Sequence, residues 1–311
     1  ATLSQVVRNK LIVSYCQVLQ SYNTIMQGID WRGIWTITTG SEPEGEYVEP
    51  YMASLLFFTI NFLTGIVLRG LSSTLLPKSI AGYAVDFIST MEACAYFFEN
   101  NFVLKHYGGI WFGVAIVIQC FMCARTFGHS SENPVKSLHQ FMENEITLRT
   151  ALLKILFQTS AGLASYYFAK LVWSLDLISD HHERYHETEC ESDLHVTLFM
   201  GFLIELCACL SDTWLSMQTV SATSSLDELI KYVNAATMIT IGVTTTGMYI
   251  NPAMASGHTI GCHGTALWEH FFVYWAGPFI GCFVAFHVNN FIHIDVTTKK
   301  SVSSHEDKKT K

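Results

Sequence analysis

The stretch TGMYINPA, residues 246–253, decides the fold, because its Asn-Pro dipeptide follows a long apolar run and has a counterpart, NPV, at residues 133–135. Asparagine is a strong helix N-cap, and proline is favoured at the first helical position. Each dipeptide is therefore predicted to begin a short helix, running to about Met142 in the first copy and to about His258 in the second. The residues of the two motifs are Asn133, Pro134, Val135, Asn251, Pro252 and Ala253.

Each Asn-Pro motif follows an apolar segment that contains one acidic residue. Asn133 lies 47 residues after Asp86, and Asn251 lies 46 residues after Glu205. Three membrane helices per copy is an odd number, so the second copy is predicted to insert upside down. The two short helices then meet at their positive N-termini halfway across the membrane. The asparagine amides point N–H donors into one gap, which accepts the oxygen of a neutral molecule and repels cations.

Composition places the chain among helical integral membrane proteins. Of 311 residues, 50% are hydrophobic and only 14% are charged, against about 25% in an average soluble domain. A nucleic-acid-binding function is excluded because Asp and Glu number 26 against 18 Lys and Arg, a net charge of −8. Nine cysteines are too few for a disulfide-built mini-protein.

Apolar runs long enough for a bilayer core predict membrane helices. There are seven such segments: 52–68, 79–98, 107–124, 155–175, 194–217, 232–268 and 270–294. We divide the chain into an N-terminal extension (1–78) that contains an acidic loop (41–49) and an extra hydrophobic helix, a channel domain (79–294, with repeats of about 79–175 and 194–294) and a tail (295–311). The segment 52–68 either crosses the membrane or lies against the core.

Lysine and arginine placement orients the chain. With alternating segments, the basic residues flank one side, which is predicted to be cytosolic; Lys105 is an exception. The C-terminus is then cytosolic, and its last residues, Lys308-Lys309-Thr310-Lys311, resemble a dilysine retrieval signal for the endoplasmic reticulum.

These motifs resemble the aquaporins, the major intrinsic protein family. The second motif is the family's Asn-Pro-Ala signature, and the altered first motif is typical of the unorthodox, or super-, aquaporins of animals. Cys262, nine residues after Ala253, and the stretch HFFVYWAGP at 270–278 also resemble that subfamily. The resemblance covers roughly 79–290. It implies an all-α membrane protein with six core transmembrane helices and two re-entrant half-helices, forming a homotetramer that passes water and sometimes glycerol, hydrogen peroxide or other small neutral solutes. It implies no enzyme, cofactor or metal.

The resemblance also implies a selectivity filter, but this chain departs from the family pattern there. Ordinary aquaporins have an arginine after the second motif, where this chain has Met254. The other filter positions, carried over by spacing, are Phe112, Ile239 and Met248. Four apolar residues argue against a fast, water-only channel and favour glycerol or peroxide. The alternative is that the two methionines block the passage.

Lys136 is the repeat mate of Met254, so we predict that its positive charge lies in the cytosolic vestibule and helps to exclude cations. The alternative is that its stem reaches cytosolic water or that it pairs with Glu132, four residues earlier.

Asp86 and Glu205 are acids within membrane helices, which are costly to keep there and usually functional. The resemblance implies that they brace the re-entrant loops through backbone N–H groups; a proton relay is the alternative. Glu92 and Asp212 form a second, weaker pair.

The predicted lumenal side contains two further candidates. Cys190 and Cys262 both lie there, and an oxidising lumen permits a disulfide between them. The histidines near 181–195 are interpreted as a solvated loop, with a zinc site or a pH gate as alternatives. For the whole chain, the alternative to a pore is an aquaporin-fold scaffold that does not conduct.

Overall fold

The computed structural model describes residues 30–40 and 47–296. Within these ranges the regular structure is helical, apart from two isolated β-bridges. The described residues form two compact units, one built from residues up to 53 with 170–186 and the other from 54–169 with 187–296. Most of the predicted acidic loop at 41–49 and the lysine-rich end of the tail lie outside the described residues.

The smaller unit contains two short helices, α2 (Trp31–Thr39) and α7 (Ser179–His186). The Nη2 of Arg32 lies 3.2 Å from the carboxylate of Asp176, and the indole of Trp35 donates to the carbonyl of Leu175 at 2.7 Å. These contacts fix α2 to the segment before α7.

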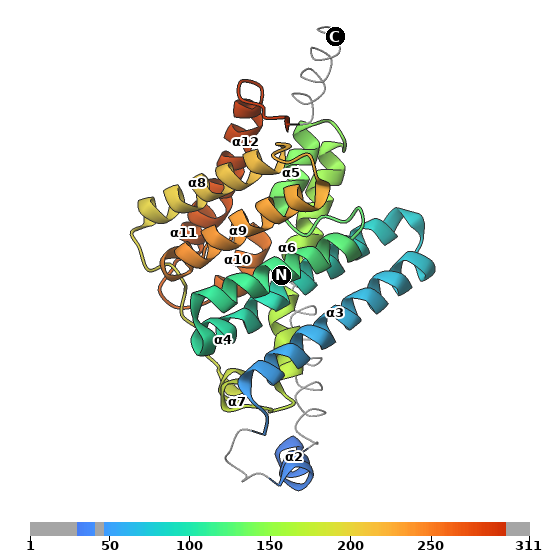
Figure 1. The fold of residues 1–311 in the computed structure, drawn as a ribbon, viewed down its shortest axis with the longest axis vertical. Coiled ribbons are helices and arrows are strands. Elements are labelled where there is room, and N and C mark those ends of the chain that lie inside the picture. Colours follow the sequence, from blue (N-terminus) through green and yellow to red (C-terminus); the bar gives the residue numbers. More distant parts are fainter. Residues whose placement is uncertain (1–29, 41–46, 297–311) are drawn as a thin grey trace, which may run out of the picture. The chain divides into compact units, whose positions relative to one another are not determined.

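The remaining helices are the extra helix α3 and the helices of the predicted channel domain, and Figure 1 shows their order along the chain. They are α3 (Pro50–Leu75), α4 (Lys78–Thr126), α5 (Pro134–Met142), α6 (Leu148–Trp173), α8 (Leu198–Ser216), α9 (Ser224–Thr246), α10 (Pro252–Thr259), α11 (Leu267–Phe271), the π-helical turn η1 (Phe272–Ala276) and α12 (Gly277–Asn289).

Helix α4 joins two of the predicted segments. The sequence predicts separate helices at 79–98 and 107–124, whereas α4 runs through both and is interrupted only at Gly108, where φ is +76° and ψ is 179°. Glycine adopts this conformation without a side-chain clash. The arms on either side turn back on one another, because the amides of Asn100 and Gln119 exchange two hydrogen bonds of 2.7 and 2.9 Å. A single-residue break therefore replaces the predicted loop.

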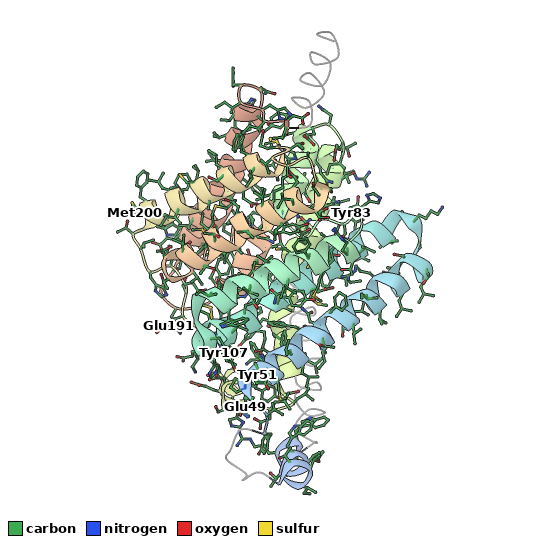
Figure 2. The ribbon with its side chains drawn as sticks, viewed as in Figure 1. Glu49, Tyr51, Tyr83, Tyr107, Glu191 and Met200 are labelled. Atoms are coloured by element: carbon green, nitrogen blue, oxygen red, sulfur yellow. A yellow bond between two sulfur atoms is a disulfide. The ribbon has the colours of Figure 1, made fainter. Side chains whose placement is uncertain are left out.

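Four helices of the described chain are long and apolar enough to cross a membrane: α3, α4, α8 and the continuous stretch Leu267–Asn289. Their outer surfaces expose large apolar side chains, such as Met200 on α8, which is 50% exposed (Figure 2). Helices α6 and α9, with 26 and 23 residues, also reach the length of a bilayer core at about 1.5 Å per residue.

The short helices α5 and α10 contact each other and the long helices of the larger unit. Helix α5 also packs against α12, and α10 packs against α4, while α8 contacts both α9 and α12. The approach of α12 to α8 depends on Gly281, where a β-carbon would stand 2.4 Å from the carbonyl oxygen of Leu206. Both half-helices are thus enclosed by membrane-length helices.

Candidate functional site

The two half-helices begin at the residues that the sequence predicts. Asn133 is the N-cap of α5, and its side-chain oxygen accepts a hydrogen bond from the backbone N–H of Val135 at 2.9 Å. Asn251 caps α10 in the same way and accepts from the N–H of Ala253 at 3.0 Å. With 9 and 8 residues, each helix is about 12–14 Å long, or roughly half of a 30 Å core.

The side-chain amide nitrogens of the two asparagines bond across to the opposite motif. The Nδ2 of Asn133 donates to the carbonyl oxygen of Ile250 at 3.2 Å, and the Nδ2 of Asn251 donates to that of Glu132 at 3.1 Å. The acceptors are the residues that immediately precede each asparagine. The N-termini of α5 and α10 are therefore adjacent, with their positive dipole ends together.

Asp86 holds the loop before the first motif. Its Oδ1 accepts from the backbone N–H of Ser131 at 2.8 Å, and its Oδ2 lies 3.1 Å from the ammonium of Lys154 on α6. Asp86 is 3% exposed, so this lysine supplies the opposite charge that a buried carboxylate requires. The contact with Ser131 has the geometry of the predicted bracing role.

Glu205 holds the loop before the second motif and is fully buried. Its carboxylate accepts from the hydroxyl of Thr246 at 2.7 Å and from the backbone N–H groups of Tyr249 and Ile250 at 3.1 and 2.9 Å. Met248 and Ile250 have positive φ angles of 46° and 53°. Such conformations cost non-glycine residues about 1–3 kcal/mol each and persist only when surrounding bonds fix them. Glu205 bonds Ile250 directly, and it holds Met248 through Thr246, whose hydroxyl accepts from the N–H of Met248 at 3.1 Å.

A close crossing of α6 and α10 is a feature of the site that the sequence does not show. A β-carbon at Gly162 would stand 2.0 Å from the carbonyl oxygen of Ala253, and one at Gly257 would stand 2.2 Å from that of Gly162. Two facing glycines therefore let the half-helix lie directly against α6. In the sequence, the only sign of this crossing is a glycine in each of the two segments. A glycine in each segment does not show that the two face each other.

The four predicted filter residues do not lie in one cluster. Phe112 is fully buried in a hydrophobic cluster against which Ile239 and Met254 pack. Met248 lies in a second cluster with Val135, and Ile239 packs against both clusters. The positive φ of Met248 accompanies its packing against Gly242 on α9. Phe112 and Met254 are thus in one cluster and Met248 is in the other, while Ile239 contacts both.

Lys136 forms an ion pair with Glu132, which was the alternative to a vestibule role. Its side chain is nevertheless 60% exposed, and the ammonium also interacts electrostatically with Asp212 on α8. Of the weaker pair of repeat-related acids, Glu92 forms an ion pair with Arg69 on α3, and Asp212 is the acid near Lys136.

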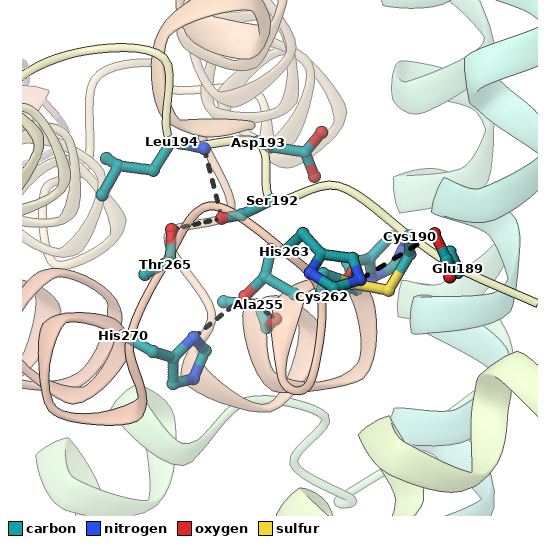
Figure 3. The surroundings of a disulfide bond; sticks show 12 residues. Glu189, Cys190, Ser192, Asp193, Leu194, Ala255, Cys262, His263, Thr265 and His270 are labelled. Carbon is teal, nitrogen blue, oxygen red and sulfur yellow. Dashed lines mark hydrogen bonds and ion pairs between the residues drawn. A yellow bond between two sulfur atoms is a disulfide. The ribbon is translucent and has the colours of Figure 1, made fainter.

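A disulfide joins Cys190 to Cys262 and attaches the strap, the extended segment of residues 190–193, to the chain just after α10 (Figure 3). Two backbone bonds of 2.8 Å flank it, from the N–H of Ser192 to the carbonyl of His263 and from the N–H of His263 to that of Cys190. Asp193 on the same strap accepts a hydrogen bond from the hydroxyl of Tyr249, two residues before Asn251. The strap therefore contacts the residues before the second motif and the residues after α10.

The histidine-rich region contributes no metal centre within the described residues. His182 lies 3.1 Å from a carboxylate oxygen of Asp176 and packs against the ring of His186. Burial, followed by the nearby His182, lowers the pKa of His186 below its ordinary value.

Comparison with known proteins points to one family. The model of the major intrinsic proteins matches residues 42–288. Aquaporin-11 of Milnesium tardigradum is 25% identical over 240 residues (77% of this chain and 87% of the relative), and aquaporin-12 of Mus musculus is 29% identical over 247 residues (75% and 83%). The aquaglyceroporin structure from Plasmodium falciparum covers 76% of this chain and 95% of its own at 16% identity, with a TM-score of 0.44.

An all-α membrane fold with two abutting half-helices defines a membrane channel rather than an enzyme. The chain belongs to the major intrinsic protein family. Its similarity to aquaporin-11 and aquaporin-12 confirms the resemblance to the unorthodox aquaporins.

Proposed function

We propose that the chain conducts small neutral solutes passively, namely water, glycerol, hydrogen peroxide or a subset of these, along a passage beside the paired half-helices. The observation that carries this proposal is the reciprocal bonding of Asn133 and Asn251 across the two motifs. A side-chain amide nitrogen has two hydrogens, and each cross-bond uses one. The second N–H of each asparagine is the donor for a solute oxygen.

The apolar side chains at the predicted filter positions support a preference for some solutes over water. Met254 occupies the position of the family's filter arginine, and it packs with Ile239 against the cluster that contains Phe112. Without a fixed cation, this part of the passage offers few polar partners to water. Glycerol, which carries an apolar carbon chain, is then favoured relative to water, and hydrogen peroxide remains a second candidate.

We also propose that Lys136 lines the cytosolic vestibule, since its side chain is largely exposed. Glu132 and Asp212 lie around it, so the local charge is mixed rather than simply positive. The proposed assembly is a homotetramer, and the proposed location is the endoplasmic reticulum, on the basis of the family resemblance.

Stopped-flow measurements on proteoliposomes test the function directly. Vesicles that contain the purified full-length chain are exposed to gradients of sucrose, glycerol and hydrogen peroxide, and the rates are compared with those of protein-free vesicles. A pore raises at least one rate above the protein-free level and lowers its activation energy.

A non-conducting scaffold is the second candidate. The tight packing of Phe97, Phe112, Tyr249 and Tyr274 in one cluster beside α10 favours it, because these rings fill space next to the half-helix. Rates equal to those of empty vesicles for all three solutes would support the scaffold and contradict the pore.

A further inference from the structure

The extra helix α3 contains an arginine that is almost completely buried. Arg69 is 5% exposed and forms an ion pair with Glu92 on the first arm of α4, which is 1% exposed. Both helices are apolar enough to cross a membrane. Ionisable residues in such segments are rare and usually functional, because removing the charge from water is expensive.

Three polar contacts place α3 along α4 in a defined register. In addition to the ion pair, the amide of Asn61 donates to the backbone carbonyl of Glu92 at 2.9 Å, and the hydroxyl of Ser54 donates to the carboxylate of Glu99 at 2.8 Å. Residue numbers rise along α3 as they fall along α4, so the helices run antiparallel. From Ser54 onward, the buried residues of α3 recur every three or four positions, which defines a single face: Ser54, Phe57, Asn61, Gly65 and Arg69.

The contact is close as well as polar. A β-carbon at Gly65 would stand 1.8 Å from the Oε2 of Glu92. The carboxylate therefore lies directly against the backbone of α3, one turn before Arg69. Replacement of Gly65 by any other residue would displace Glu92 from the arginine.

Arg69 also reaches the loop that leads to the first Asn-Pro motif. Its guanidinium carbon lies 4.8 Å from the centre of the Phe127 ring, within the range of a cation–π interaction. Phe127 is the C-cap of α4, and its carbonyl accepts from the N–H and the hydroxyl of Ser130 at 3.1 and 2.9 Å. Ser131, the next residue, is the one that Asp86 holds.

The ion pair is not explained by stability alone. The Nη2 of Arg69 is buried without a hydrogen-bond partner in the described structure. A buried ion pair can often be replaced by apolar residues without loss of stability, whereas removal of one partner is strongly destabilising. An arginine here, with an unsatisfied nitrogen, needs a role that an apolar side chain cannot fill, and its contact with Phe127 supplies one.

We propose that α3 is a fixed part of the channel body and that Arg69 is a positioning residue, which holds the loop of residues 127–132, and through it Asn133, by the contact with Phe127. The transport part of this inference rests on the proposed function. The loop-ordering part does not, so the test uses hydrogen exchange as its main measurement.

The first experiment separates the ion pair from the loop contact by thermal unfolding of the full-length protein in detergent. R69M should lower Tm by on the order of 10 °C, because it leaves Glu92 buried and unpaired. The double variant R69M/E92Q should regain most of this loss, since both charges are gone. A wild-type Tm for R69M would overturn the role of the ion pair.

The second experiment measures hydrogen exchange of the backbone amides at 128–132 by mass spectrometry. F127L removes the ring but keeps the ion pair, so it should speed exchange in this loop several-fold with little change in Tm, and F127Y should restore the wild-type rate. F202L, which removes a ring that stacks on Phe272 of η1, is the control and should leave the loop unchanged.

Unchanged exchange in F127L would overturn the positioning role. If the wild-type protein conducts, F127L should also lower the solute rate and F127Y should recover it. If the wild-type protein conducts nothing, the proposed function fails, while the exchange result still decides whether Arg69 orders the loop.

Discussion

Gly162 on α6 lies so close to Ala253 on α10 that a β-carbon on the glycine would stand 2.0 Å from the alanine's carbonyl oxygen. Real side chains do not approach a backbone atom this closely, and a backbone atom cannot rotate aside. Because Gly162 has no side chain, the half-helix that begins at Asn251 can pack directly against α6.

Gly162→Ala is expected to shift α10 and to destabilise the protein by about 3 kcal/mol, the upper part of the range for overpacking. Its Tm in detergent measures the effect. Gly70→Ala is the matched control, because nothing lies within 4 Å of the β-carbon on α3 and alanine is the better helix former. Equal Tm values for the two variants would show that the crossing is looser than the structure describes.

Asn133→Asp tests the cross-bond separately from the helix cap. Aspartate still caps α5 through Val135, but it replaces the donor to Ile250 with an oxygen that faces the carbonyl. We expect a loss of about 1–3 kcal/mol and a lower solute rate in proteoliposomes. Asn290→Asp, at an exposed position after α12, controls for the added charge and should leave the rate unchanged. A wild-type rate in Asn133→Asp would argue that the donor is not used.

Glu205→Gln tests the brace of the second loop. The carboxylate accepts three hydrogen bonds, whereas a glutamine amide offers one oxygen and turns a donor toward another donor. We expect a destabilisation of about 2–3 kcal/mol and a disturbed loop at Met248 and Ile250, whose positive φ angles need these bonds. Thermal unfolding measures the first effect, and hydrogen exchange at 247–251 measures the second. Glu191→Gln, an exposed acid on the strap, should change neither.

The sequence predicts the half-helices well because their start signals are local. An asparagine followed by proline sets the cap and the first turn without help from the rest of the chain, and α5 and α10 begin accordingly. The matched spacing to Asp86 and Glu205 likewise anticipates which acids face the two loops.

The sequence does not show features that depend on partners far along the chain or on a left-handed backbone conformation. Spacing assigns Met248 and Met254 to one filter, and it does not show that Met248 has a left-handed backbone and packs in another cluster. Arg69 resembles an interfacial flank in the sequence, and only the packing of α3 on α4 shows that it is buried against Glu92.

The bond between Cys190 and Cys262 gives a prediction about redox conditions. It closes a span of 72 residues, and in the chain-entropy model a cross-link of this length restricts the unfolded chain by about 4 kcal/mol. Reductant should therefore lower the Tm of the wild-type protein clearly. It should have no further effect on a variant in which both cysteines are serine, because the other cysteines of the described chain are free.

Loss of this disulfide should also disturb the structure around the second Asn-Pro motif. Asp193 lies three residues after Cys190 and holds the hydroxyl of Tyr249, so release of the strap removes a contact two residues before Asn251. We expect a reduced solute rate in the serine variant, with Tyr249→Phe reproducing part of the loss while the disulfide stays intact. Non-reducing mass mapping verifies the bond in each sample. A rate that falls in the serine variant but not in Tyr249→Phe would assign the effect to α10 itself, and a rate unchanged in both would separate the strap from transport.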